Sequence, residues 1–86
     1  MENAWLAAVR SELEGATGAD LALTRDEIDE LLRLASFAAH ESGAKLNAPL
    51  LCYLVGRARE ASGQAVAELA DAARAGAPAP ATADRA

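Results

Sequence analysis

Bulky hydrophobic residues return every three or four positions along most of this 86-residue chain, with polar residues between them. This spacing places the hydrophobic residues on one side of an α-helix, whereas a β-strand would need them at alternate positions. No segment shows the two-residue period of a strand. The pattern therefore predicts an all-α fold, a small bundle of three to four helices.

The first helix is predicted over about residues 3–13. Asn3 can cap its first turn, and Trp5, Val9 and Leu13 follow at four-residue steps, so they form one stripe. A loop is predicted over residues 15–20, where two glycines occur. No repeat of this segment occurs elsewhere in the chain.

The second helix has the clearest start signal. Thr24 and Glu27 have the spacing of a capping box, in which each side chain binds the backbone amide of the other residue. Gly43 is predicted to end the helix in the left-handed conformation. Between these ends lies a continuous apolar face, made of Ile28, Leu31, Leu32, Ala35, Ala38 and Ala39.

The third helix is the most apolar segment of the chain. Asn47 is expected to cap it, and Pro49 falls in its first turn, where the missing amide hydrogen of proline costs least. Gly56 near its middle indicates a close approach of another helix. A helix that is apolar on so many sides is either central in its bundle or covered by another chain. Its apolar residues are Leu50, Leu51, Tyr53, Leu54, Val55, Ala58 and Ala61.

A fourth, weaker helix is predicted over about residues 63–75, after a break at Ser62-Gly63. The remaining residues, 76–86, are rich in alanine and proline and hold no bulky apolar side chain. Such a composition predicts a disordered tail. The domain organisation expected is therefore a helical domain at 1–75 and a disordered tail at 76–86.

The totals favour a soluble chain that needs a companion. The net charge is −5 and 52% of the residues are apolar, although alanine supplies much of that fraction. A domain this small buries only about 60% of its unfolded surface, so a partner that covers more leucine is expected. Cys52 is the single cysteine, which excludes a disulfide within the chain. No secretory signal and no membrane-spanning run is seen, so we expect a cytoplasmic protein.

The chain contains few residues that could bind a metal or act in catalysis. His40, the only histidine, has no ligand partner at metal-binding spacing, and Cys52 lies in apolar surroundings that should raise its thiol pKa. The acidic cluster at 26–30 is typical of a helix start rather than a calcium loop. Phosphate loops and nucleophile motifs are absent, and the apolar third helix with a net charge of −5 argues against nucleic-acid binding. We therefore expect no enzyme, catalytic residue, metal or cofactor.

The chain resembles a small domain of unknown function that is common in actinobacteria and occurs alone or at the C-terminus of molybdenum-cofactor guanylyltransferase-like proteins. The resemblance covers about residues 3–70 and implies an accessory role near molybdenum-cofactor maturation. It implies no catalytic residues. The matching features are Trp5, Arg25-Asp26, Ala39-His40, Ala48-Pro49-Leu50 and Leu54-Val55-Gly56.

These observations lead to the hypothesis that the chain is a non-enzymatic interaction module that binds another protein. An enzyme that handles the molybdenum cofactor is the first candidate for this partner. Two alternatives stay open: a self-associating homodimer, and a small-molecule or cofactor-binding domain with His40 and Arg57 in a pocket between the second and third helices. The candidate interaction residues are His40, Pro49, Leu50, Leu51, Tyr53, Leu54, Gly56 and Arg57.

Overall fold

The computed structural model describes residues 3–78 and confirms the all-α prediction. Four helices occur in this range, and no strand is found within it. Of the predicted tail, Gly76 still belongs to the last helix, and residues 79–86 lie outside the described part of the chain. None of the described helices is long and apolar enough to cross a membrane. The helices are α1 (Ala4–Thr17), α2 (Arg25–Ser42), α3 (Asn47–Ser62) and α4 (Val66–Gly76).

The helix-end signals at α2 act as the sequence predicts. The Thr24 amide donates to Oε1 of Glu27 at 2.8 Å, and the Glu27 amide donates to Oγ1 of Thr24 at 3.1 Å. Gly43 ends the helix at φ 71°, in the left-handed region that a residue with a Cβ rarely enters. Asn3 likewise caps α1, because its Oδ1 accepts from the Leu6 amide at 2.8 Å.

Two predicted boundaries, the end of α1 and the start of α4, are wrong by a few residues. α1 continues to Thr17 because Gly18, at φ 73°, supplies the left-handed end and donates its amide to the Glu14 carbonyl at 2.8 Å. α4 begins only at Val66 because Gly63, at φ 75°, closes α3.

Asn47 is not the cap of α3 but its first helical residue. The connection from α2 is so short that the Asn47 amide already donates to the Ala44 carbonyl at 3.0 Å, within a tight turn. Leu46 occupies the cap position with helical dihedral angles and makes no side-chain cap bond. Pro49 does lie in the first turn, as predicted.

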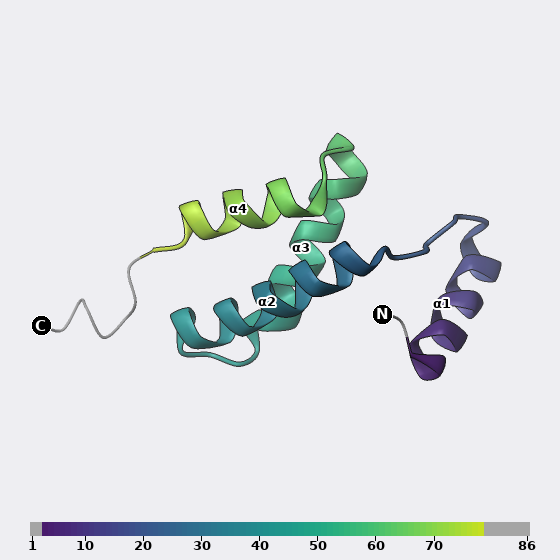
Figure 1. Cartoon of the computed structure of the whole chain (residues 1–86), viewed down its shortest axis with the longest axis horizontal. Helices are drawn as coiled ribbons and strands as arrows, with labels where there is room; N and C mark the ends of the chain where they lie inside the picture. The colour runs from purple at the N-terminus through teal and green to yellow at the C-terminus, as the bar shows by residue number, and fades with distance from the viewer. Residues whose placement is uncertain (1–2, 79–86) are drawn as a thin grey trace, which may run out of the picture.

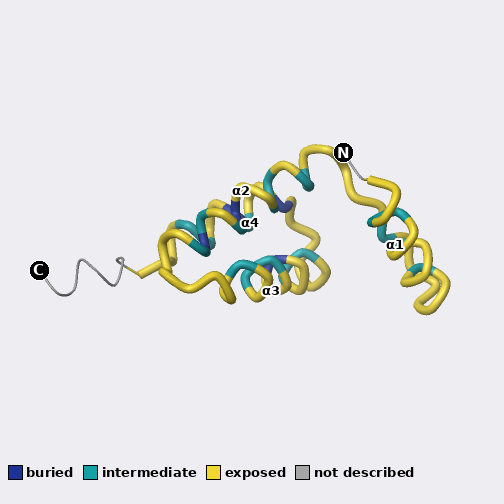
Figure 2. Tube along the Cα trace, turned by 90° about the horizontal axis from the view of Figure 1, so that it is seen from below, coloured by how far each residue is buried: buried dark blue, intermediate teal, exposed yellow. Residues whose placement is uncertain are grey.

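Helices α2, α3 and α4 pack against one another as a three-helix unit. Figure 2 shows α3 on one side of this unit and α2 and α4 on the other. Its core is small: Leu34 of α2 is fully buried at the centre, and Val55, Val66 and Ala70 surround it. Larger side chains cover this core only in part, so much apolar surface stays in contact with solvent. The partly buried ones are Leu31, Phe37, Leu51 and Leu69.

Helix α1 stands apart from this unit (Figure 1). It approaches none of the other three helices and has no buried residue. The radius of gyration is 14.6 Å, against about 11–12 Å for a compact domain of this length. Three side chains of α1, which we call the α1 stripe, therefore lie largely in solvent: Trp5, Val9 and Leu13.

Gly56 does not mark a close helix approach. It is exposed, and a Cβ placed on it would meet no atom within 4 Å. The close packing of a second helix, which was expected to offset the cost of a glycine inside α3, is therefore missing at Gly56.

Candidate functional site

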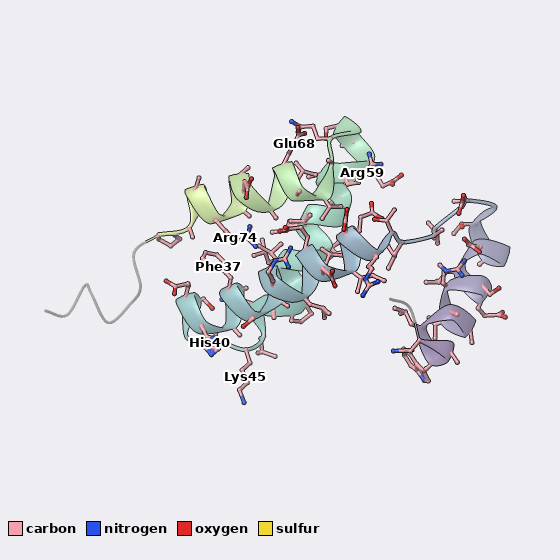
Figure 3. The ribbon with its side chains drawn as sticks, viewed as in Figure 1. Phe37, His40, Lys45, Arg59, Glu68 and Arg74 are labelled. Atoms are coloured by element: carbon pink, nitrogen blue, oxygen red, sulfur yellow. The ribbon has the colours of Figure 1, made fainter. Side chains whose placement is uncertain are left out.

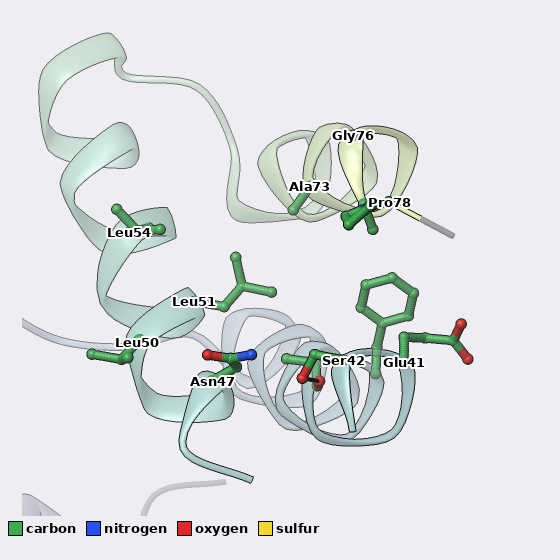
Figure 4. Close-up of a pocket in the computed structure, with 12 residues that line it drawn as sticks. Glu41, Ser42, Asn47, Leu50, Leu51, Leu54, Ala73, Gly76 and Pro78 are labelled. Carbon is green, nitrogen blue, oxygen red and sulfur yellow. Dashed lines mark hydrogen bonds between the residues drawn. The ribbon is translucent and has the colours of Figure 1, made fainter. Parts of the chain in front are cut away.

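An apolar groove opens at one end of the three-helix unit, between the C-terminal half of α2, the start of α3 and the end of α4 (Figure 4). We call it the end groove; its volume is about 680 Å³. Leu51, Phe37 and Ala73 line it from three different helices. Glu41, Ser42 and Asn47 place polar atoms on its rim (Figure 4). Its other lining residues are Ala38, Leu50, Leu54, Gly76, Ala77 and Pro78.

The side of α3 that points away from the core forms a second apolar surface. Leu46, Leu50 and Leu54 recur there at four-residue steps, and Tyr53 lies beside them. All four are exposed, with Tyr53 at 67% and Leu46 at 78%. We call these four residues the outer face of α3. Of the wide apolar arc that the sequence indicates for this helix, Leu50, Tyr53 and Leu54 are thus exposed, whereas the other helices cover Val55 fully and Leu51 in part.

The structure brings together only part of the predicted interaction set. Leu50, Tyr53 and Leu54 share the outer face, and exposed Arg57 continues the same side of the helix one turn further on. Leu51 turns the other way and packs against the core. Pro49 and Gly56 are exposed on α3.

His40 lies away from these residues, near the C-terminal end of α2, where Figure 3 shows it pointing outward. Its Nδ1 is 3.2 Å from the Ser36 carbonyl oxygen. Neither His40 nor Arg57, which are expected to share a pocket between α2 and α3 in the cofactor-binding alternative, lines the end groove or the hollow beside the start of α2. His40 lies near the C-terminal end of α2, and Arg57 lies in the C-terminal half of α3.

Cys52 is half-buried between α3 and α2. Its Sγ lies 3.8 Å from the carbonyl oxygen of Leu31. Desolvation by this burial raises the pKa of the thiol, as its apolar surroundings predict. The thiolate that a nucleophile requires is therefore disfavoured.

Two of the acidic residues in the first turns of α2, Glu27 and Glu30, make structural contacts. Glu30 accepts from Arg33 at 2.8 Å and from Arg74 of α4 at 3.3 Å, so it joins two helices. Hydrogen bonding and charge from Arg33 lower the pKa of the Glu30 carboxyl; Arg74 adds to the effect, and partial desolvation opposes it. The Arg74 guanidinium also lies 6.0 Å from the centre of the Phe37 ring (Figure 3).

Residues 3–78 contain no candidate metal-binding site. No group of three or more His, Cys, Asp or Glu side chains converges there as metal ligands would. Glu27, which could have been a ligand, instead completes the cap of α2.

The sequence predicts only some of the residues that form the end groove and the outer face of α3. Leu50, Leu51 and Leu54 are among the predicted interaction residues. Phe37, Ala73 and Pro78 were missed because they join the site only through the packing of α2 against α4. The position of Phe37 on the apolar side of α2 was the one signal that could have indicated it.

The fold defines a small all-α domain with two exposed apolar surfaces, the end groove and the outer face of α3. The chain belongs to the family described as "Domain of unknown function (DUF6457)", whose model matches residues 2–85. No curated protein and no solved structure matches the chain.

Proposed function

We propose that this chain is a non-enzymatic interaction module that holds an amphipathic helix of another protein in its end groove. The observation that carries the proposal is the shape of the groove, which is open to solvent and lined by apolar side chains from three helices. Helix recognition uses a groove of this kind, into which the partner inserts apolar anchors spaced three or four residues apart.

Charge restricts the partner further. Glu41 lies on the rim of the groove, and the chain as a whole carries a net charge of −5. A partner helix with lysine or arginine beside its apolar anchors would meet a complementary surface, which favours association and correct register.

The resemblance to domains attached to molybdenum-cofactor guanylyltransferase-like proteins supplies the first partner to test. An enzyme that handles this cofactor in the same cell would carry the amphipathic helix, and the module would act as its accessory. The proposal places both in the cytoplasm, where Cys52 remains a free thiol.

The test is a titration of the full chain against a purified molybdenum-cofactor guanylyltransferase from the same genome, followed on a biosensor surface. Ala77→Arg adds bulk and positive charge at the rim of the groove without touching the core, because Ala77 is exposed. Ala72→Arg makes the same change on an exposed part of α4 outside the groove. We expect saturable binding that Ala77→Arg weakens at least tenfold and Ala72→Arg leaves unchanged.

Two results would overturn the proposal. One is the absence of binding at protein concentrations up to on the order of 100 μM, which is 100 times the dissociation constant of a micromolar interaction. The other is binding that Ala77→Arg does not alter, which would place the contact elsewhere on the chain.

A further inference from the structure

Two apolar stripes of equal length are exposed on helices that do not touch. The α1 stripe runs at four-residue steps over residues 5–13, and Leu46, Leu50 and Leu54 of the outer face of α3 do the same over residues 46–54. The first and last side chain of each stripe are thus about 12 Å apart along the helix axis. Rows at four-residue steps are the ridges that interdigitate in the commonest class of helix packing. The two stripes therefore match in length and in ridge type.

The segment between α1 and α2 holds α1 away from the three-helix unit of its own chain. Four side-chain oxygens and one backbone carbonyl, within the segment or in the helices beside it, accept hydrogen bonds from five of its amides, so the segment has a defined conformation. The Leu21 amide donates to Oε2 of Glu14 at 2.8 Å, which ties the segment back to α1. The other four amides are those of Gly18, Ala19, Ala22 and Thr24.

α1 also needs a partner for its own stability. It has 14 residues, and isolated helices of this length are marginal in water even with good sequences. Its cap at Asn3 and its Arg10–Glu14 ion pair at 3.0 Å support it locally, yet Trp5 is 73% exposed. Burial of the α1 stripe would supply the tertiary support that the structure of one chain lacks.

We propose that α1 of each copy packs on the outer face of α3 of a second copy, so that two chains exchange their first helices in a symmetric dimer. A reciprocal exchange of this kind closes on itself and leaves neither stripe exposed. The occupant of the outer face is therefore the α1 stripe of an identical chain.

Charge and area are consistent with this occupant. The outer face is flanked by Lys45 at one end and Arg57 at the other, and α1 carries exposed Glu12 next to Leu13. Trp5 is 73% exposed and Tyr53 is 67% exposed, so their burial removes up to about 200–350 Å² from solvent in each contact. Since the exchange makes the contact twice, these aromatic side chains alone supply about a third of the about 1,200–2,000 Å² of a stable interface.

This inference does not depend on the proposed function. The outer face and the end groove share only Leu50 and Leu54, and Tyr53 and the α1 stripe belong to the exchange alone. The groove variant Ala77→Arg should leave the dimer intact, so either idea can fail without the other.

The experiment is sedimentation equilibrium of the full chain over a range of concentrations, combined with fluorescence of Trp5, the only tryptophan. Val9→Glu places a charge in the middle of the α1 stripe, and Tyr53→Glu does so on the outer face. Ser11→Glu is the matched control, because Ser11 is exposed on the opposite side of α1. Thermal melting confirms that the three-helix unit of each variant is folded.

The wild type should sediment as a dimer, and its tryptophan emission should move to shorter wavelength as concentration rises. We expect Val9→Glu and Tyr53→Glu to weaken association at least about 30-fold, the effect of losing a hot spot, and Ser11→Glu to leave it unchanged. A mixture of the Val9→Glu and Tyr53→Glu chains should regain association, because one intact contact forms between them.

Three outcomes would overturn the exchange. A monomer whose tryptophan stays exposed at every concentration would show that nothing of this chain covers the α1 stripe. A monomer with a buried tryptophan would show that α1 folds back on its own chain. A dimer that Val9→Glu leaves unchanged would use another surface.

Discussion

The substitution Leu34→Ala tests whether the three-helix unit depends on its one large buried side chain. Leu34 is 0% exposed, and its neighbours in the core are small: Val55, Val66 and Ala70. Removing three carbon atoms there costs about 0.8 kcal/mol for each in lost burial, and the small neighbours cannot expand to fill the cavity. We expect a loss of about 3 kcal/mol in the free energy of unfolding.

A loss of this size is most of the stability of the domain. Cores of this scale supply only roughly 3–5 kcal/mol in total. With a urea slope of about 1 kcal/mol per molar for a small protein, the unfolding midpoint should fall by about 3 M. The Leu34→Ala chain should therefore be partly unfolded in buffer alone, and titration with a protecting osmolyte would recover its folded signal and its free energy.

Leu32 provides the matched control on the same helix. It is 65% exposed, so Leu32→Ala makes the same chemical change outside the core and should cost less than about 0.5 kcal/mol. Urea unfolding followed by far-ultraviolet circular dichroism measures both variants. Equal costs for the two, or a Leu34→Ala cost below about 1 kcal/mol, would refute the view that packing around Leu34 holds α2, α3 and α4 together.

Three further predictions follow from single residues. Gly56→Ala should stabilise the domain by up to about 1 kcal/mol, because a Cβ at this position would contact no other atom. Gly43→Ala should destabilise it by about 1 kcal/mol, because Gly43 has a φ of 71° that alanine rarely adopts. Thermal melting compares the two variants. The pKa of Glu30 is lowered in the folded chain, so its contribution to stability is present above about pH 4.5, the pKa of a free glutamate carboxyl, and is lost as the pH falls below that pKa. The wild type should therefore lose more stability on acidification than Glu30→Gln. The raised pKa of Cys52 predicts slow alkylation of the native thiol at pH 8, rising to the rate of a free thiol in denaturant, and fast native alkylation would contradict its burial.

Local signals predicted the helices well. Thr24 and Glu27 form a capping box in a segment whose apolar face is continuous, so the start of α2 follows from side chains only three residues apart. Gly43 ends the helix for an equally local reason, its freedom to adopt positive φ. The boundary of α1 was missed because Gly15 and Gly18 are both plausible ends by composition, and only Gly18 takes the left-handed conformation.

Tertiary relations were harder to predict. The apolar arc of α3 was visible in sequence, yet its division was not: Leu51 and Val55 face the core while Leu50 and Leu54 face solvent. That division depends on which side of α3 receives α2 and α4. The end groove depends on the same packing, since Phe37 and Ala73 are 36 residues apart in the chain, and no pattern within either helix indicates their meeting.

Helix α1 shows why a predicted amphipathic helix does not by itself define a fold. Its cap, its i,i+4 ion pair and its terminal glycine specify a helix through contacts within about four residues. Each is worth about 1 kcal/mol or less, too little to hold 14 residues in one conformation against chain entropy. A helix of this kind persists when its apolar stripe is buried, so its stability is linked to whatever surface receives it. Under the proposed exchange, the receiving surface is the outer face of α3 of a second copy, and the helicity of α1 would then rise with association.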